Sequence, residues 1–434
     1  MLHPDDLGKL NNIFRPKRIE INYPNPLNEK AYYGLAGEVV KLILPHSEAD
    51  PVALLINFLT CFGNIVGNTP HFKIGADKHT MRLFSVLVGE SAKARKGHSY
   101  GFIEHIFKAT DEDWENRSQS GLSTGEGLIW AVRDQIVKKR PVKEKGTGRI
   151  LDYEDVIEDE GVKDKRLLVL ESEFASVLKV ANREGNILSP VVRQAWDKGN
   201  LRTLTKNSPS KASDTHISIL AHITREELLR YLNKTETSNG FANRFLWLCV
   251  KRSNILPFGG DFDKVNTAPL ILKLRQAIEF ASSVERITWA EETKPLWGKI
   301  YPTLSEGRAG LIGSLTARAE AYVTRIACIY ALLDMSQEIR IEHLEAALAL
   351  WDYNEASIKY IFQNKIGDPL AEKILQLLSE NQNGLSKTDI SNSLGRNYSA
   401  DQISTSLSIL ESLGYVTTLL VKTEGRPKEI WKLI

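Results

Sequence analysis

The sequence has little cysteine and no hydrophobic run that reaches the length of a membrane span. Only three of its 434 residues are cysteines, and each stands in an apolar stretch without metal-ligand spacing. The three thiols are therefore expected to be buried hydrophobic residues in a reducing cytoplasm, and neither a disulfide framework nor a zinc site is expected. The apolar stretch Pro51 to Gly63 is too short to cross a bilayer, and the N-terminus lacks the layout of a signal peptide. We expect a cytoplasmic protein with no membrane partner.

The chain also lacks a strong net charge. Its formal charge is +2, with 25% charged and 42% hydrophobic residues, which is ordinary for a folded protein. No global field favours nucleic acid or a membrane surface, so any binding of this kind must be local. The length suggests two to four domains with ample material for a core.

Short apolar runs alternate with segments that have helical periodicity. Each of these runs is typical of a buried strand: Arg82–Val88, Arg166–Leu170, Thr215–Leu220 and Arg244–Val250. Buried strands that alternate with helices predict an α/β fold with a mostly parallel sheet.

Shifts in composition predict five parts of the chain. Residues 1–30 are linker-like, 31–69 form a small helical cap, 70–262 form the α/β core, and 263–365 form a helical lid with two long amphipathic helices. Within the core, residues 138–165 are basic and then acidic, which predicts an excursion from the sheet. From Glu291 to the C-terminal block no strand is expected. Residues 366–434 show a helix, a helix-turn-helix and two strands around a turn, the order of a winged helix.

The first expected strand leads into "LVGESAKARKGHSYGF", which has the layout of a phosphate-binding loop. Such a loop needs backbone N–H groups at a helix N-terminus, a lysine for phosphates and a hydroxyl for Mg²⁺. Gly89, Lys96, Gly97 and Ser99 would serve these roles, with Lys93 as the alternative phosphate lysine. The loop is one residue longer than the usual pattern, and its glycine follows the lysine. A basic surface turn is the other interpretation.

Two later strands end in polar residues that suit the same chemistry. In "RLLVLESEF", Glu171 would hold Mg²⁺ and Glu173 would orient the attacking water. His222 or Thr224, after the third strand, would sense the terminal phosphate. In "NGFANRFLW", Arg244 stands directly before a buried strand, where it would act as an arginine finger. Structural alternatives are a capped helix after Glu173, a structural histidine, and an ion pair at a helix–strand corner.

Taken in this order, the motifs resemble AAA+ ATPases, particularly the MCM-type replicative helicases. The blocks "TGEGLIWAVRD", "LESEFASVL", "RQAWDKGNLRTLTK", "HISILAHIT" and "NGFANRFLW" are similar to a family of P-loop ATPases of prophages, plasmids and integrated elements. The resemblance covers about Leu83 to Phe362. It implies a P-loop ATPase core, and "LTARAEAYVTRIACIYALL" is similar to the lid segment that carries a sensor arginine, here Arg318. Leu246 stands where the helicases have an acid after the arginine finger.

Two segments point to DNA. The stretch between Glu173 and the third strand lies where the related helicases place a hairpin in the ring channel, and it offers Arg202, Lys206 and Lys211 to a DNA backbone. The C-terminal domain would offer Ser399, Gln402, Ser404, Arg426 and Lys428. It holds seven Lys or Arg and eight Asp or Glu, so it is not basic. A solvated hairpin and a protein-docking winged helix are the alternatives.

These expectations combine into an ATP- and Mg²⁺-dependent DNA motor. Because an arginine finger acts on a neighbour's nucleotide, the chain would form a ring, expected to be a hexamer, that serves replication of a mobile element. Single-stranded DNA would occupy the channel, duplex DNA would contact the winged helix, and a separate primase or initiator would be a partner. The first alternative is a recruitment scaffold with a degenerate nucleotide site. The second is a winged-helix regulator with an inert core.

Overall fold

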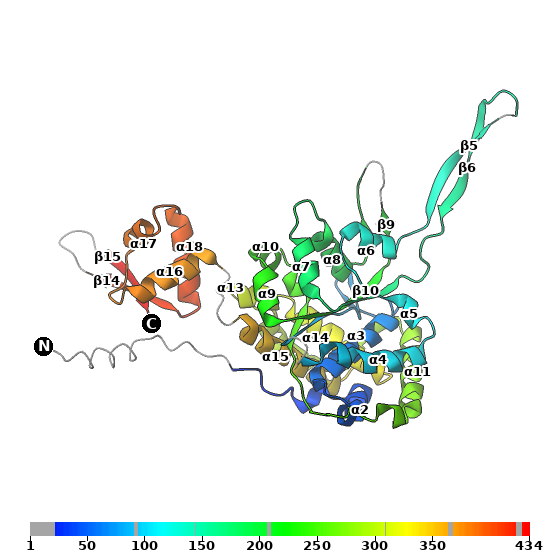
Figure 1. Ribbon diagram of the computed structural model, residues 1–434, viewed down its shortest axis with the longest axis horizontal. Helices are drawn as coiled ribbons and strands as arrows, with labels where there is room; N and C mark the ends of the chain where they lie inside the picture. Colours follow the sequence, from blue (N-terminus) through cyan, green and yellow to red (C-terminus); the bar gives the residue numbers. More distant parts are fainter. Residues whose placement is uncertain are drawn as a thin grey trace. The chain divides into compact units, whose positions relative to one another are not determined.

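The computed structural model of the chain describes residues 22–90, 94–143, 145–205, 210–308, 310–362, 368–421 and 428–434. These residues divide into two compact units (Figure 1). The larger unit comprises Asn25–Glu306 and Arg318–Ser357, and the smaller one includes Ile358–Ile434. The predicted residues Lys93, Lys206 and Arg426 lie outside the described part.

A parallel five-stranded sheet forms the centre of the larger unit. Its strand order is β11-β3-β10-β7-β4, and every pair of neighbours is parallel. The strands are β3 (Phe84–Val88), β4 (Ser118–Gln119), β7 (Arg166–Glu171), β10 (His216–Ile223) and β11 (Leu246–Cys249). The prediction of an α/β fold with a mostly parallel sheet is confirmed. Each of the four apolar runs overlaps one strand, and β7 and β10 extend beyond the ends of their runs. Every residue of β10 is buried, as expected for a central strand that is covered on both faces.

Helices cover both faces of this sheet. On one face lies α3 (Pro51–Ile65), whose Thr60 hydroxyl is 3.2 Å from the Ser85 hydroxyl of β3. Successive side chains of a strand point to opposite faces, so Phe84 points to the other face and packs there on Phe245, which also contacts Phe174 of α7. The segment predicted as a helical cap therefore contributes a layer of the α/β core itself.

The remaining helices of the core connect and surround the strands. They are α2 (Gly34–Ile43), α4 (Lys96–Thr110), α5 (Trp114–Arg117), α6 (Gly125–Ala131), α7 (Phe174–Ala181), α8 (Leu188–Asp197), α9 (Arg225–Tyr231) and α10 (Lys234–Ser238). Short 3-10 turns occur at Glu29–Ala31, Leu44–His46, Ala242–Arg244 and Phe262–Lys264.

A second, four-stranded sheet accompanies the helices that follow the core. Its order is β13-β12-β1-β2, with β1 (His71–Ile74), β2 (Asp77–Thr80), β12 (Arg286–Trp289) and β13 (Glu338–Ile339). The helices of the larger unit here are α11 (Ala268–Ser283), α12 (Lys294–Ser305), α14 (Ala319–Leu333) and most of α15 (Ile341–Phe362). The smaller unit includes α13 (Gly310–Thr316) and the end of α15. The two long helices predicted here, α14 and α15, are present. The expectation of no strand after Glu291 is wrong at β13, and α14 is buried almost throughout instead of amphipathic.

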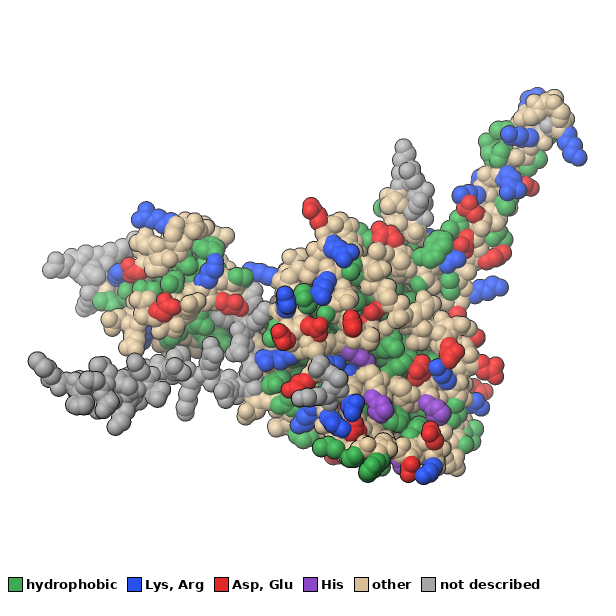
Figure 2. All heavy atoms as spheres, viewed as in Figure 1, with side chains coloured by type: hydrophobic (Ala, Val, Ile, Leu, Met, Phe, Trp, Pro, Cys, Tyr) green, Lys and Arg blue, Asp and Glu red, His purple; other side chains and the backbone are tan. Residues whose placement is uncertain are grey.

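Two hairpins leave the α/β core. The longer one pairs β5 (Ile136–Lys143) with β6 (Ile150–Asp159) and extends away from the sheet (Figure 1). Lys and Arg side chains stand toward its tip, whereas Asp and Glu side chains stand nearer its base (Figure 2). The shorter one pairs β8 (Leu201–Arg202) with β9 (Lys211–Ala212). The segment after Glu173, where a hairpin was expected, and the excursion expected at 138–165 therefore each form an antiparallel pair of strands.

The smaller unit contains the element order that the sequence predicts for its C-terminal part. The helices are α16 (Pro369–Glu380), α17 (Lys387–Ser393) and α18 (Ala400–Ser412), and β14 (Val416–Val421) pairs antiparallel with β15 (Lys428–Leu433). Its own apolar core includes Ile374, Ile390, Leu407 and Trp431. A separate core of this kind is what allows such a segment to fold as a unit.

Candidate functional site

The candidate site lies at the carboxyl ends of β3 and β10, where α4 begins. In open α/β sheets ligands bind at this edge of the strands. The register places Val88 of β3 opposite Ile223 of β10, and the N–H of Gly89 donates to the Ile223 carbonyl oxygen at 3.2 Å. The loop that the sequence singles out therefore starts against the end of β10.

Lys96 is the first residue of α4, and its ammonium group ties the loop to both strands. Its Nζ donates to the carbonyl oxygens of Gly89 at 2.9 Å, Glu90 at 3.0 Å and Ile223 at 3.2 Å. Burial lowers the pKa of Lys96 to about 8, and the carboxylate of Glu227 acts in the opposite direction. The result is a partly desolvated cation at a helix N-terminus, which is a favourable place for an anion.

His222 lies at the end of β10 beside this lysine. Burial, followed by the charge of Lys96, lowers the pKa of His222 to about 4, so its imidazole is neutral at pH 7. Its Nε2 is buried and has no hydrogen-bond partner among the described residues. Thr224, the alternative sensor, instead caps α9 through reciprocal bonds with Glu227. His222 is thus the one of the two with an unused polar atom.

The two predicted catalytic acids have different environments. Glu171 ends β7 and is buried, and its Oε1 accepts the N–H groups of Gly121, at 2.8 Å, and Leu122. It therefore organises the loop between β4 and α6. Glu173 is exposed at the N-cap position of α7 without a side-chain cap bond, so its carboxylate is the one of the two that solvent reaches.

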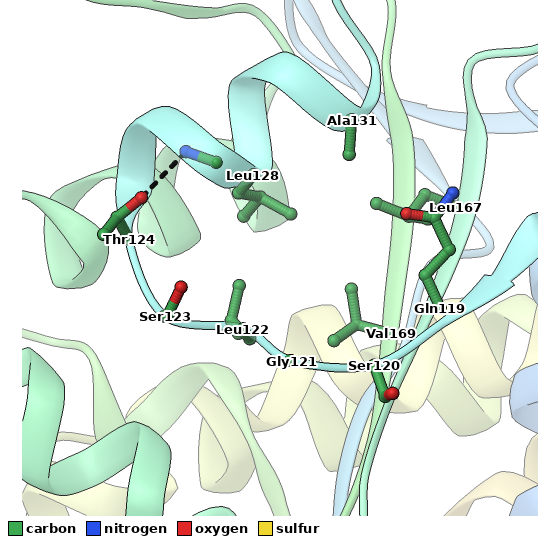
Figure 3. Close-up of a pocket in the computed structure, with 11 residues that line it drawn as sticks. Gln119, Ser120, Gly121, Leu122, Ser123, Thr124, Leu128, Ala131, Leu167 and Val169 are labelled. Atoms are coloured by element: carbon green, nitrogen blue, oxygen red, sulfur yellow. Dashed lines mark hydrogen bonds between the residues drawn. The ribbon is translucent and has the colours of Figure 1, made fainter.

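A pocket that the sequence did not indicate lies beside the loop held by Glu171. It has a volume of about 120 Å³ and is lined by this loop, α6 and β7 (Figure 3). Apolar side chains such as Leu128 and Val169 line one part of it, and hydroxyl-bearing residues such as Ser123 and Thr124 line another. The Thr124 hydroxyl is already used, because it accepts the N–H of Gly127 at 2.9 Å.

Ser99 is buried beneath the first turn of α4. Its hydroxyl donates to the Lys96 carbonyl oxygen at 2.6 Å and accepts from Asn57 Nδ2 of α3 at 3.0 Å. A role of Ser99 in holding Mg²⁺ therefore requires the first turn of α4 to move. Ahead of that turn, Arg95 adopts a left-handed conformation with φ 50° and forms an ion pair with Glu48, at 2.8 Å between Nε and Oε2.

The two glycines predicted at this loop provide a matched stability test. A Cβ on Gly89 would lie 2.4 Å from the carbonyl oxygen of Val250, whereas a Cβ on Gly97 would meet no atom of the described residues within 4 Å. We expect Gly89→Ala to destabilise the larger unit by about 1–3 kcal/mol through overpacking. Gly97→Ala, inside a helix, is expected to stabilise it by roughly 0.5–1 kcal/mol. Thermal unfolding of both variants checks this, and effects of equal sign would contradict it.

Arg244 lies at the opposite, amino-terminal edge of the sheet. It precedes β11, whose Leu246 is in register with Ser85, so Arg244 stands beside Leu83. From Leu83 to Gly89 the strand covers roughly 20 Å at about 3.3 Å per residue. Arg244 is therefore remote from the loop of its own chain. It is also buried and forms the corner ion pair considered as its structural alternative, with 2.8 Å between its Nη2 and Asp197 Oδ2.

Arg318 meets Arg244 at one aromatic ring. It precedes α14, and its guanidinium lies 5.5 Å from the centre of the Trp196 ring, compared with 5.8 Å for Arg244. The two arginines predicted for phosphoryl transfer are thus brought together, while Lys96 and His222 form a second group at the other edge. Trp196 and Asp197 were not predicted as site residues. The only indication of them in the sequence is that the "RQAWDKGN" block is part of the family resemblance.

Among the predicted DNA contacts that the structure describes, the hairpin residues are exposed, whereas most of the C-terminal residues already have partners within the protein. Arg202 and Lys211 are exposed and stand opposite each other on β8 and β9. In the smaller unit, Ser399 and Gln402 form a reciprocal capping box at the start of α18. Ser404 is half-buried on the same helix, and Lys428 Nζ lies 3.1 Å from Asp389 Oδ2. Ser399 and Gln402 therefore have a structural role that does not depend on DNA.

These observations define a mixed α/β protein with polar groups at both edges of a parallel sheet. The sequence matches no known family model, and a comparison with curated proteins finds no match. Within the described part of the chain, every helix is too short or too polar for a transmembrane segment. The described residues also contain no cluster of three or more His, Cys, Asp or Glu side chains suited to a metal ion.

Proposed function

We propose that this chain is an AAA+-type ATPase that acts as a motor on DNA in a ring of identical copies. The observation that carries the proposal is the position of Lys96, at the N-terminus of a long helix and bonded across the ends of two parallel strands. Phosphates that replace its carbonyl partners would gain both the ammonium charge and the backbone N–H groups of the first turn, which have no partner within a helix.

The neighbouring strand ends supply the remaining chemistry in this proposal. In the strand order, β10 with His222 lies between the loop strand β3 and the acidic strand β7. A sensor strand between these two agrees with an AAA+-type core. Glu173 would orient the attacking water and His222 would contact the terminal phosphate through its unused Nε2. Mg²⁺ would neutralise phosphate charge and would be held by the phosphates, water and Glu171, because this ion is usually bound through one or two carboxylates.

The distance between the two groups supports a ring. Arg244 and Arg318 lie at the amino-terminal edge of the sheet, roughly 20 Å from the loop that carries Lys96. They would therefore reach a nucleotide only if it is bound to another copy. The exposed Arg202 and Lys211 of the β8–β9 hairpin would contact a DNA backbone, and the helix order of the smaller unit supports a winged helix.

The main competing function is a recruitment scaffold with an inactive nucleotide site. Two observations favour it, because Ser99 is buried and Glu171 already binds two backbone N–H groups. The smaller unit also exposes apolar side chains on β14, of which Leu420 is 78% exposed. Exposed apolar groups suit a protein partner better than a DNA backbone.

ATP hydrolysis by the purified chain, with and without single-stranded DNA, separates these functions. The motor is expected to be stimulated by DNA, and Glu173→Gln should lower turnover by about 100-fold or more because water is no longer oriented by a base. Glu184→Gln is the matched control, since Glu184 is also an exposed acid, in the segment between α7 and α8. Turnover that ignores DNA would contradict the motor. Absence of both ATP binding and hydrolysis would contradict the nucleotide site and leave the scaffold.

A further inference from the structure

Helix α8 ends at Trp196 and Asp197. The Trp196 ring lies beside both arginines of the proposed phosphoryl transfer, and Asp197 binds one of them, Arg244. Trp196 is buried, and its ring is approached by Arg318, Arg244 and Arg325, with 3.7 Å from the Arg325 guanidinium to the ring centre. The face of an indole ring is electron-rich and attracts guanidinium groups. Three guanidinium groups from different parts of the chain therefore lie around this ring.

The position of the ring is determined by contacts that are independent of any ligand. The indole N–H donates to the Tyr322 hydroxyl at 3.2 Å. The last carbonyl groups of α8 are capped by buried arginines: Arg82 Nη1 donates to the Ala195 oxygen at 2.6 Å, and Arg325 Nη2 donates to the Trp196 oxygen at 3.1 Å. Cations are favourable at a helix C-terminus, so these bonds hold the end of α8 and the Trp196 ring in place.

Asp197 distinguishes the two arginines. It accepts from Arg244 Nε at 3.3 Å and Nη2 at 2.8 Å, and Arg244 Nη1 donates to the Gly240 carbonyl oxygen. Arg318 is half-buried, and within the described residues its guanidinium makes no hydrogen bond or ion pair. The N–H donors of Arg318 are therefore available to an anion, whereas those of Arg244 are largely occupied.

We propose that Trp196 is a positioning residue that holds Arg318 ready for the terminal phosphate of a nucleotide bound to an adjacent copy. In this arrangement Asp197 restrains Arg244, which joins the phosphate only when its ion pair with Asp197 opens. The inference rests on the proposed function, because the anion is the nucleotide at the Lys96 loop of the neighbouring copy. Arg244 is too far from the loop of its own chain to serve there, and Arg318 lies beside the same Trp196 ring as Arg244.

Steady-state kinetics test the role of the ring. Trp196→Leu removes the electron-rich face and is expected to lower kcat for ATP by about tenfold to 100-fold while KM changes little, because the guanidinium is needed mainly in the transition state. The matched control is Trp114→Leu, which removes another buried tryptophan, one that stacks on Phe107 at 4.7 Å. Its kcat should stay within about twofold of the wild type. A KM effect alone for Trp196→Leu would overturn the proposal.

Asp197→Asn tests the restraint on Arg244. The substitution keeps the shape of the side chain and removes the charge that competes with phosphate for the guanidinium. Turnover is expected to rise by about tenfold, the lower end of the effect of a hydrogen bond to a charged group. A fall in turnover would overturn the role given to Asp197.

Mixing two variants with reduced turnover tests whether the positioned arginine acts on another copy. Trp196→Leu keeps Lys96, and Lys96→Ala keeps Trp196, so a mixed ring contains sites with both parts intact. We expect the turnover of the mixture to exceed that of either variant alone, which also demonstrates that Trp196→Leu is folded. If that variant does not fold, Arg318→Gln should show the same fall in kcat and the same recovery. No recovery with an active wild type overturns this inference alone, whereas an inactive wild type overturns the proposed function as well.

Discussion

Lys96→Ala is expected to lower ATP turnover by about 100-fold or more without unfolding the chain. The lost ammonium is the charged donor at the strand edge, and one preorganised donor of this kind is worth about 10²–10³ in rate. Lys108→Ala is the matched control, because Lys108 lies on the same helix with an exposed side chain whose partners are Glu104 and Glu115. Its turnover should equal that of the wild type. Similar losses in both variants would point to helix stability instead of phosphate binding.

The pH dependence of nucleotide binding is a second test of whether Lys96 binds phosphate. Because burial places the pKa of Lys96 at about 8, the free protein carries a neutral amine above this pH. Phosphates bind the protonated form, so affinity should fall as pH rises through 8, by about tenfold per pH unit at higher pH. Lys96→Arg stays charged over this range and should lack the inflection. An unchanged affinity of the wild type between pH 7 and 9.5 would show that Lys96 is not the phosphate lysine.

The fold was predictable where burial leaves a continuous signal in the sequence. The strands β3, β7, β10 and β11 are covered on both faces, so each appears as an apolar run, and the loop between β3 and α4 follows from its glycine and lysine. The strands β4 and β13 have two residues each, too few for any periodicity. The sequence therefore allowed Lys96 to be placed at the end of a strand. It did not reveal β4, the edge strand that pairs with β7.

The environment of individual site residues depends on partners far away in the chain. The hydroxyl of Ser99 is buried, and it accepts a hydrogen bond from Asn57, on a helix that precedes the sheet. Arg244 is held by Asp197, and no local pattern connects these two positions. One local signal was available and interpreted differently: Ser399 and Gln402 have the spacing of a capping box, and the structure uses them in this way.

Arg325→Ala is expected to cause the largest loss of stability, about 3–5 kcal/mol for the larger unit. Arg325 is buried on α14, stacks on Trp196 and donates to the carbonyl oxygens of Trp196 and Arg82, at 3.1 and 3.2 Å. Truncation leaves a cavity beside the ring and removes a donor from both carbonyls, and each effect is destabilising. Arg286→Ala, at an exposed position on β12, should change stability by less than about 0.5 kcal/mol.

Two further substitutions at Arg325 separate its charge from its shape. Burial, and then the charge of Arg82, lower the pKa of Arg325 to about 9, so its cation is held against a desolvation cost. Arg325→Met removes that cost and fills much of the space, and its loss should be smaller than that of the alanine variant. Arg325→Lys keeps the charge but cannot reproduce the planar fork over the Trp196 ring, so it should lose more stability than methionine. Chemical denaturation measures the stability of both variants. If the lysine variant is more stable than the methionine variant, the positive charge at the end of α8 matters more at this position than packing and hydrogen bonding.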